Sequence, residues 1–184
     1  TPPYWIDLVS SNISSFLRDH AHNERKVAAS AMTLAAHHPS DYDFVEAMMT
    51  VAREELKHFQ QVHRILRKRE ISLGFDEPDP YMTRFHKLMR KPNAKHFFLD
   101  RLVCASIVEA RGCEKFQLLS ENLTDHELRD FYSKLAISEK RHHEVFLYFA
   151  KKHFSELEVN ERLKLFLEKE MVFIKEIPKR AALH

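Results

Sequence analysis

The chain has 184 residues, of which 44% are hydrophobic and 30% charged, with a formal net charge of +2. This length suits one domain with a substantial core, and we expect a single domain over residues 1–184. A net charge this close to zero excludes binding to nucleic acid through bulk charge, so any such affinity must come from a local patch. No uncharged apolar run reaches the roughly 18 residues of a membrane span, and no signal peptide is visible.

Glycine and cysteine are both scarce, with two residues of each. So few glycines, with seven prolines, suit an all-helical protein. Cys104 and Cys113 lie on opposite faces of one predicted helix, about 13 Å apart along its axis, and cannot pair with each other. Two reduced thiols are typical of a cytoplasmic protein, which is the location that we expect.

Apolar residues at helical spacing predict seven helices, separated by prolines and capping residues. These helices are expected over residues 2–9, 11–37, 42–71, 81–89, 93–121, 125–153 and 156–176. Gly74 is the expected residue after the third helix, and Thr124 with Glu127 is the expected capping box of the sixth. The residues of the last helix that are expected to cover the bundle are Leu163, Phe166, Leu167, Val172 and Phe173.

A Glu-x-x-His motif occurs in both halves of the chain, as Glu55/His58 and as Glu139/His142. Residues three apart share a helix face, so the carboxylate and the imidazole of each pair can bind one metal ion. A single copy is a common pattern that usually marks a solvated helix face. Here each glutamate lies within an apolar stripe, where an uncompensated carboxylate is costly, so both pairs are predicted to face the core.

Two further glutamates lie in apolar stripes on the preceding helices. Glu24 precedes Glu55 by 31 residues, and Glu109 precedes Glu139 by 30. The chain is therefore predicted to form two helical hairpins, each with a glutamate on its first helix and Glu-x-x-His on its second. Four inward glutamates and two histidines are the ligand set of a di-iron or di-manganese carboxylate site in a four-helix bundle.

Other registers are possible, because Glu54 precedes His58 by four residues and Glu139 precedes His143 by four. We prefer the spacing of three, since it alone repeats in both copies with the glutamate that is predicted to be buried. The remaining histidines are expected to lie at the surface or to cap helices. They are His20, His22, His37, His38, His63, His86, His96, His126, His153 and His184.

The ligand set determines the chemistry that we expect. Four carboxylates balance two divalent ions, and mixed carboxylate and imidazole ligands favour iron or manganese. Six side chains leave coordination positions open for dioxygen. By analogy with such sites, Glu55 and Glu139 bridge the two ions, Glu24 and Glu109 are terminal ligands, and each histidine binds one ion.

Two runs of basic residues flank the crossover between the hairpins. No acidic residue occurs from Tyr81 to Leu99. The runs form either ordinary solvated faces or, as we prefer, a phosphate-binding patch. They comprise Arg64, Arg67, Lys68, Arg69, Arg84, Lys87, Arg90, Lys91 and Lys95.

Two segments, Asp19–Lys26 and Ile107–Arg111, together with the paired hairpins, resemble the bacterial tRNA hydroxylases of the MiaE family over nearly the whole chain. The resemblance implies an all-α, ferritin-like four-helix bundle with an additional C-terminal helix. A long crossover connects helices 2 and 3 of the bundle, which are the helices expected over residues 42–71 and 93–121. The resemblance also implies two iron ions, dioxygen as co-substrate, and hydroxylation of 2-methylthio-N6-isopentenyladenosine in the anticodon loop of tRNA.

Such a reaction needs a pocket for the substrate and a source of electrons. The base must leave its stack, and its isopentenyl tail is expected to enter near Glu109, beside Ala105, Ser106, Gly112 and Phe116. Gly112 either leaves room above the metal ions or allows close helix packing. Two glycines exclude a Gly-x-Gly-x-x-Gly loop and two cysteines cannot hold an iron–sulfur centre, so a separate reductase or ferredoxin is expected to supply electrons.

Three other functions share parts of this pattern. A ferritin- or rubrerythrin-like iron-handling protein has the same ligands but needs no basic patch. A helical tRNA-binding module with a vestigial site binds nucleic acid without iron. A membrane-associated quinone hydroxylase also has paired hairpins, yet it exposes apolar helix faces, which the basic crossover disfavours.

Overall fold

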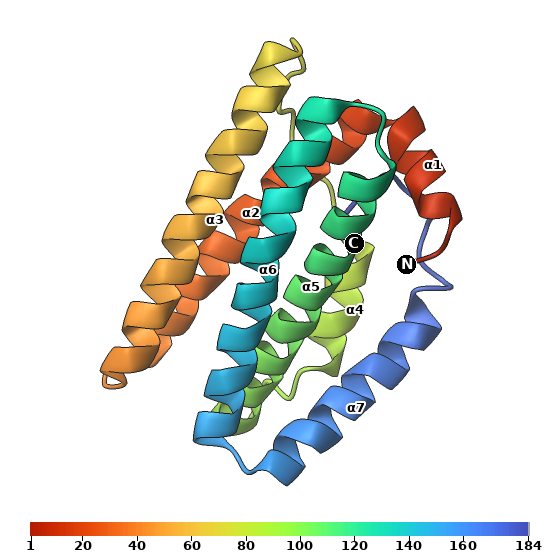
Figure 1. The fold of residues 1–184 in the computed structure, drawn as a ribbon. Helices are drawn as coiled ribbons and strands as arrows, with labels where there is room; N and C mark the ends of the chain where they lie inside the picture. Colours follow the sequence, from red (N-terminus) through yellow and green to blue (C-terminus); the bar gives the residue numbers. More distant parts are fainter. Residues whose placement is uncertain (184) are drawn as a thin grey trace. The chain divides into compact units, whose positions relative to one another are not determined.

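All regular structure among residues 1–183, which the computed structural model describes, is α-helical (Figure 1). The helices are α1 (Tyr4–Ser11), α2 (Ile13–His37), α3 (Tyr42–Lys68), α4 (Pro80–Leu88), α5 (Ala94–Asn122), α6 (His126–His153) and α7 (Glu156–Phe173). The seven predicted helices are therefore confirmed, with ends that differ by a few residues. No helix in this part of the chain is long and apolar enough to cross a membrane.

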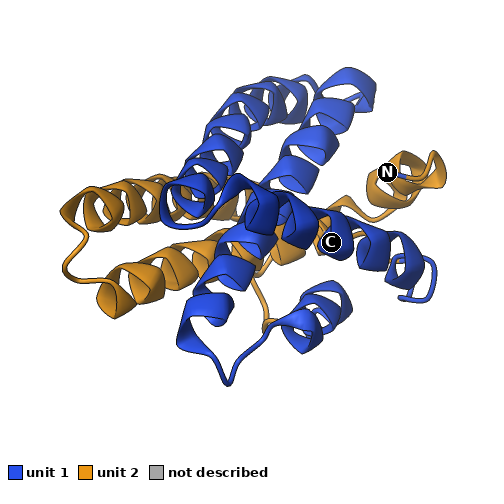
Figure 2. Ribbon diagram, turned by 90° about the horizontal axis from the view of Figure 1, so that it is seen from below, with its two compact units in different colours: residues 1, 78–179, 184 blue, residues 2–77, 180–183 orange. Residues whose placement is uncertain are grey.

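The helices fall into two compact units, which Figure 2 distinguishes by colour. The first unit in chain order comprises residues 2–77 and 180–183 and is orange in Figure 2, where the key calls it unit 2. The second comprises Thr1 and residues 78–179 and is blue, where the key calls it unit 1. Each unit contains one of the two expected hairpins, α2–α3 in the first and α5–α6 in the second. That the units form one domain stays a prediction.

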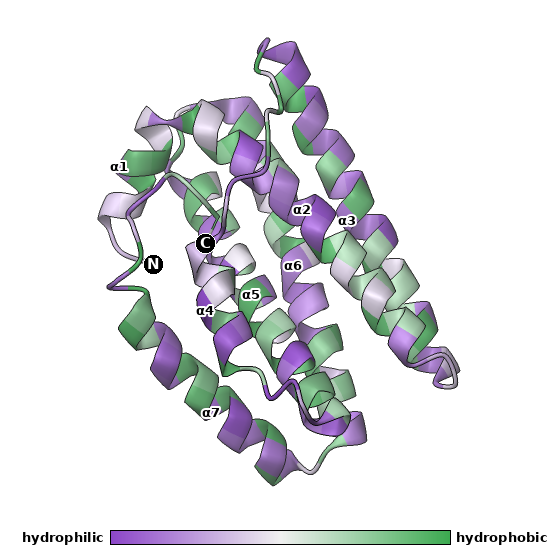
Figure 3. Ribbon diagram, turned by 180° about the vertical axis from the view of Figure 1, so that it is seen from behind, coloured by the Kyte–Doolittle hydropathy of each residue, from purple (hydrophilic) through white to green (hydrophobic). Residues whose placement is uncertain are grey.

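The α2–α3 hairpin turns at residues 38–41. Pro39 lies in this turn, and the side chain of Asp41 caps α3 by accepting a hydrogen bond from the backbone N–H of Phe44 at 3.2 Å. Apolar and polar residues alternate around α3, as the colours in Figure 3 show. The apolar side chains of Phe44, Met48 and Val62 are buried, so the hairpin holds a core along its length.

The end of α3 differs from the prediction. The helix ends in a Schellman motif, in which the N–H of Ile71 bonds to the carbonyl of Leu66 at 2.9 Å and the N–H of Glu70 bonds to that of Arg67 at 3.1 Å. The left-handed position of this motif is Glu70, with φ of 57°. The prediction that Gly74 follows the helix end was wrong, because the motif closes four residues earlier with a residue other than glycine.

Replacing Glu70 by glycine is expected to raise the free energy of unfolding by about 1 kcal/mol, because glycine adopts the left-handed conformation without the Cβ clash. Urea unfolding followed by circular dichroism measures the change. The control is Glu70→Ala, which removes the same charge from the helix C-terminus but keeps the Cβ. If both variants are stabilised equally, the charge and not the backbone conformation is responsible.

In the second unit, helix ends are fixed by side-chain caps. Asp125 caps α6 by accepting from the N–H of Leu128 at 3.1 Å, so the predicted capping box at Thr124 was wrong by one position. A complete capping box opens α7 instead, between Ser155 and Glu158. Cys104 and Cys113 are both unpaired thiols, as expected.

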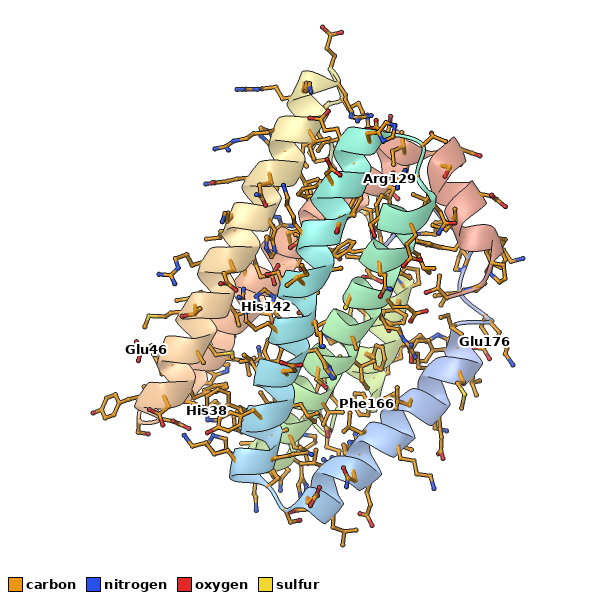
Figure 4. All side chains as sticks on the ribbon, viewed as in Figure 1. His38, Glu46, Arg129, His142, Phe166 and Glu176 are labelled. Atoms are coloured by element: carbon orange, nitrogen blue, oxygen red, sulfur yellow. The ribbon has the colours of Figure 1, made fainter. Side chains whose placement is uncertain are left out.

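An aromatic cluster joins α4 to α7. The rings of Phe85 and Phe166 stack at 5.6 Å, and Tyr81 meets Phe85 edge-on at 4.9 Å. Figure 4 labels Phe166 on α7. The prediction that Leu167 and Val172 also cover the bundle was wrong, since both are exposed.

Arginines compensate two of the buried carboxylates of the second unit, Asp100 and Glu170. Asp100 on α5 accepts hydrogen bonds from Arg90 at 2.7 Å and from Arg162 on α7 at 2.5 Å. Glu170 on α7 accepts from Arg111 on α5 at 2.7 Å. These buried ion pairs connect α7 to α5 with defined geometry, because each pairs a planar guanidinium with a carboxylate.

Candidate metal centre

In the first unit, three acidic and imidazole side chains meet in the core of the α2–α3 hairpin. Glu24 on α2 and Glu55 and His58 on α3 are all buried, and each offers a ligand atom within 4.8 Å of the others. The Nδ1 atom of His58 lies 3.4 Å from Glu24 Oε2 and 3.5 Å from Glu55 Oε2. We call these three residues the first triad.

The second unit repeats this arrangement. Glu109 on α5 and Glu139 and His142 on α6 are buried, and their ligand atoms again lie within 4.8 Å of one another. The Nδ1 atom of His142, which Figure 4 labels on α6, lies 3.4 Å from Glu139 Oε2. These residues form the second triad, so each unit carries two glutamates and one histidine.

The residues of the alternative spacings, Glu54 and His143, lie outside the two triads. Glu54 is only half-buried, whereas its neighbour Glu55 is 1% exposed. The Nδ1–H of His143 donates a hydrogen bond to the carbonyl oxygen of Ser106 at 2.7 Å, which links α6 to α5. The structure therefore turns the glutamate and histidine of the preferred spacing inward in both hairpins.

The first triad contains more negative charge than its own histidine balances. Burial lowers the pKa of His58, but the carboxylates of Glu24 and Glu55, 3.4 and 3.5 Å from its Nδ1, outweigh burial and raise this pKa to about 10. The carboxylates of Glu24 and Glu55 favour the protonated imidazole, so this buried group favours the binding of a cation. The donor atoms are carboxylate oxygens and imidazole nitrogens, so the residues fit iron or manganese.

A neighbouring histidine, which sequence reasoning missed, holds one of these carboxylates. His20 is fully buried, and its Nε2 lies 2.6 Å from Glu24 Oε1. Its ring stacks on Phe16 at 5.9 Å. The prediction that His20 lies at the surface or caps a helix was wrong. Its spacing of four from Glu24, on the same helix face, was a signal that could have found it.

His22 is likewise buried rather than at the surface, and neither ring nitrogen has a hydrogen-bond partner among residues 1–183. The other histidines of the described chain are exposed or half-buried, as expected. These are His37, His38, His63, His86, His96, His126 and His153. His184 lies outside the described residues.

We expect His20→Phe to lower the affinity of the first triad for ferrous iron by about 10- to 100-fold, the usual effect of losing an outer partner of a ligand. Phenylalanine keeps the ring that stacks on Phe16 but cannot hold Glu24. Equilibrium dialysis with ferrous iron under anaerobic conditions measures the affinity. His20→Gln, which keeps an N–H donor, should restore part of it. An unchanged affinity in His20→Phe, with a loss in His20→Gln, would indicate a packing role alone.

The residues predicted to line a substrate pocket lie along α5. Ser106 is buried, and its hydroxyl donates to the carbonyl oxygen of Val103 at 3.0 Å. Ala105 is half-buried, and Phe116 stacks on Tyr132 at 5.3 Å. None of these contacts tests a role in substrate binding, which stays a prediction.

Gly112 is buried on the face of α5 that meets α6. A Cβ added there would lie 3.8 Å from Glu139 Cγ and 3.9 Å from a ring carbon of Phe116, which are ordinary contacts. Close helix packing therefore does not demand glycine at this position. The space beside Glu139 is the size of a methyl group, which is compatible with the expected role near the metal ligands.

The predicted basic residues divide between the units, and some of them make contacts within the protein. Arg90 pairs with the buried Asp100, and Arg84 pairs with Glu176 at 3.0 Å. Arg69 is half-buried. The others are exposed, namely Arg64, Arg67 and Lys68 on α3, Lys87 on α4, and Lys91 and Lys95 near the start of α5.

Comparison with known proteins places the chain in a family. The model of tRNA-(MS[2]IO[6]A)-hydroxylase (MiaE) matches residues 1–184. A tRNA 2-(methylsulfanyl)-N6-isopentenyladenosine(37) hydroxylase of Pseudomonas putida is 33% identical over 95% of this chain and 84% of its own length. The enzyme of that name from Salmonella typhimurium is 32% identical over 72% of this chain, which spans about half (48%) of the relative.

A solved structure is also similar. It is described as protein 43 with aldehyde deformylating oxygenase activity from Synechococcus, and it has a TM-score of 0.92 with 29% identity. The likeness covers 98% of this chain and 90% of the other, and it confirms the ferritin-like, all-α fold class. With a family model matching from end to end, the chain belongs to the MiaE family of tRNA hydroxylases.

Proposed function

We propose that this protein is a dioxygen-dependent di-iron monooxygenase that hydroxylates the isopentenyl group of 2-methylthio-N6-isopentenyladenosine in tRNA. The observation that carries the proposal is the pair of buried triads, each with two glutamates and one histidine. Membership of the MiaE family, and relatives that are named hydroxylases of this nucleoside, support the choice of substrate.

Two iron ions per chain are the proposed cofactor, with all six triad residues as ligands. The carboxylate ligands would be Glu24, Glu55, Glu109 and Glu139, and the nitrogen ligands would be His58 and His142. Four carboxylates neutralise two ferrous ions, which makes a reduced centre compatible with an apolar core. When bound, the iron supplies the oxidising power to attack an unactivated C–H bond with dioxygen.

The chain's own residues position and shield this chemistry. His20 holds one oxygen of Glu24, so this carboxylate keeps one orientation. Apolar side chains beside the triads, such as Val51 and Leu135, are buried and keep bulk water away from the ligands. Ala105, Ser106, Gly112 and Phe116 are the proposed contacts of the isopentenyl tail, since the space beside Gly112 adjoins Glu139.

The reaction needs two partners besides dioxygen. A separate reductase or ferredoxin is proposed as the electron donor, because the chain lacks a nucleotide-binding glycine loop and enough cysteines for an iron–sulfur centre. The anticodon loop of tRNA is the proposed substrate, bound through the exposed basic residues of α3 to α5, so its affinity should fall steeply with salt. A cytoplasmic location fits a tRNA substrate.

The proposal is tested with the iron-loaded protein, an NADPH-reduced ferredoxin system and tRNA from cells that carry the isopentenyl modification but lack a hydroxylase. Nucleosides from digested tRNA are analysed by mass spectrometry, and the modified nucleoside should gain the mass of one oxygen atom. A protein that oxidises ferrous iron but leaves this nucleoside unchanged would instead be the ferritin- or rubrerythrin-like ferroxidase. With the ferredoxin omitted, no steady turnover is expected.

A further inference from the structure

The segment between α3 and α4 holds the most exposed large apolar side chain of residues 1–183. Phe75 is 99% exposed, within a stretch from Ile71 to Asp79 that forms no helix. A benzyl group in water forgoes the free energy that its burial would provide. When the surrounding backbone is fixed, a movement of the loop cannot bury such a side chain, so its exposure indicates a binding site.

The backbone around Phe75 is fixed on both sides by the same helix. Arg18 Nε on α2 donates to the carbonyl oxygen of Ser72 at 2.7 Å. The carboxylate of Asp76 accepts from Arg25 at 3.0 Å and from Lys26 at 3.2 Å. The loop is therefore held to α2 immediately before and after Phe75, within one compact unit.

The turn between these two attachments needs a special conformation. Gly74 has φ of +69°, which side-chain-bearing residues rarely adopt, and it directly precedes Phe75. The three features together hold the phenyl ring in water on a constrained loop. A loop held in this way loses little backbone entropy when the ring that it carries binds a flat partner.

Charges of both signs surround the loop, since Glu70, Asp76 and Glu77 are exposed beside the cations and Asp76 pairs with Arg25. Arg18 and Arg25 on α2 are exposed, and so are Arg67 and Lys68 in the last turn of α3, which leads into the loop. An aromatic ring among cations is the usual platform for single-stranded nucleic acid, in which the cations contact phosphates and the ring stacks on a base. A duplex offers no such base, since its bases are already stacked.

We infer that Phe75 stacks on an unpaired base of the RNA substrate and thereby anchors the loop that carries the target nucleoside. The inference rests on the proposed function and adds to it a residue that binds an unpaired base of the RNA. The stacked base is a neighbour of the target rather than the target itself, which must reach the metal ligands.

The test uses the full chain and two probes, a synthetic hairpin with the anticodon stem and loop of the substrate tRNA, and a blunt duplex of the stem alone. Phe75→Ala should weaken hairpin binding by about 5- to 150-fold, as loss of one base–aromatic stack does. Phe75→Leu should weaken it similarly, because leucine is apolar but has no π-face. Phe75→Trp should bind as well as the wild type, and duplex affinity should not change.

Two control variants separate this inference from the proposed function. Tyr42→Ala removes another aromatic ring, 82% exposed at the start of α3, and should leave hairpin affinity unchanged. The double variant Arg67→Glu/Lys68→Glu should weaken binding to both probes, because it removes phosphate contacts. Wild-type protein that binds neither probe would contradict the proposed function itself.

The stacking role is overturned if Phe75→Ala binds the hairpin as the wild type does while the Arg67/Lys68 variant does not. It is also overturned if Phe75→Leu retains full affinity, or if Phe75→Ala loses duplex binding equally. A change in self-association by sedimentation, with RNA affinity unchanged, would identify Phe75 as a protein contact instead.

Discussion

Replacing Glu139 by glutamine is expected to leave a folded protein that no longer holds a pair of irons. The amide is isosteric with the carboxylate but is a poor ligand and carries no charge. We expect iron content to fall from two ions per chain to one or none, and hydroxylation to fall by more than about 100-fold, the upper range for losing only an outer partner of a ligand. Metal analysis and the tRNA assay measure the two effects.

The stability of the metal-free variant distinguishes a ligand from a structural residue. Glu139 is buried, so removing its charge should leave the iron-free protein at least as stable as the wild type. Glu144→Gln is the matched control, since Glu144 is exposed on the same helix and should retain both irons. A Glu139→Gln protein that binds two irons and turns over normally would remove Glu139 from the proposed ligand set.

Asp100→Ala should have the largest effect on folding. Asp100 is fully buried between Arg90 and Arg162, and its removal leaves two guanidinium groups without their carboxylate. Breaking a buried ion pair costs about 3–5 kcal/mol, so the free energy of unfolding at neutral pH should fall by about this amount. Asp130→Ala, at an exposed position on α6, should change it by less than about 0.5 kcal/mol.

The pH dependence of this loss has a defined sign. Burial raises the pKa of Asp100, but hydrogen bonds from Arg90 and Arg162 outweigh burial and hold this pKa below its usual value. The stabilisation is therefore complete above the pKa of the unfolded chain, about 3.9, and is lost as the pH falls through the lower folded-state pKa. Urea unfolding at neutral pH and near pH 3 should show that the difference between wild type and Asp100→Ala is smaller in acid. A constant difference would contradict the ionic role.

Much of the fold could be predicted because local signals specify it. Apolar spacing over long segments gave the helices and both hairpins, and Pro39 marked the turn between α2 and α3. The helix ends were less predictable. Thr124 and Asp125 are both good caps, and only the path of the chain selects Asp125. A left-handed glutamate at position 70 has no sequence signal, since glycine is the usual residue there.

The candidate site was found because its residues repeat at fixed spacings. The buried ion pairs that join α7 to α5 were missed because their partners lie far apart in the sequence. Arg162 lies 62 residues from Asp100, and Arg111 lies 59 residues from Glu170. No local pattern relates such pairs. Phe166, Glu170 and Phe173 are the buried residues of this part of α7, whereas Leu167 and Val172 are exposed.

The source of the inserted oxygen tests the central claim most directly. The iron-loaded protein, a reduced ferredoxin and isopentenyl-modified tRNA are incubated under ¹⁸O-labelled dioxygen in ordinary water, and the nucleosides are analysed by mass spectrometry. We expect the new hydroxyl group to carry ¹⁸O, because a monooxygenase inserts one atom of dioxygen. A hydroxyl group that carries oxygen from water would identify a hydratase and contradict the account.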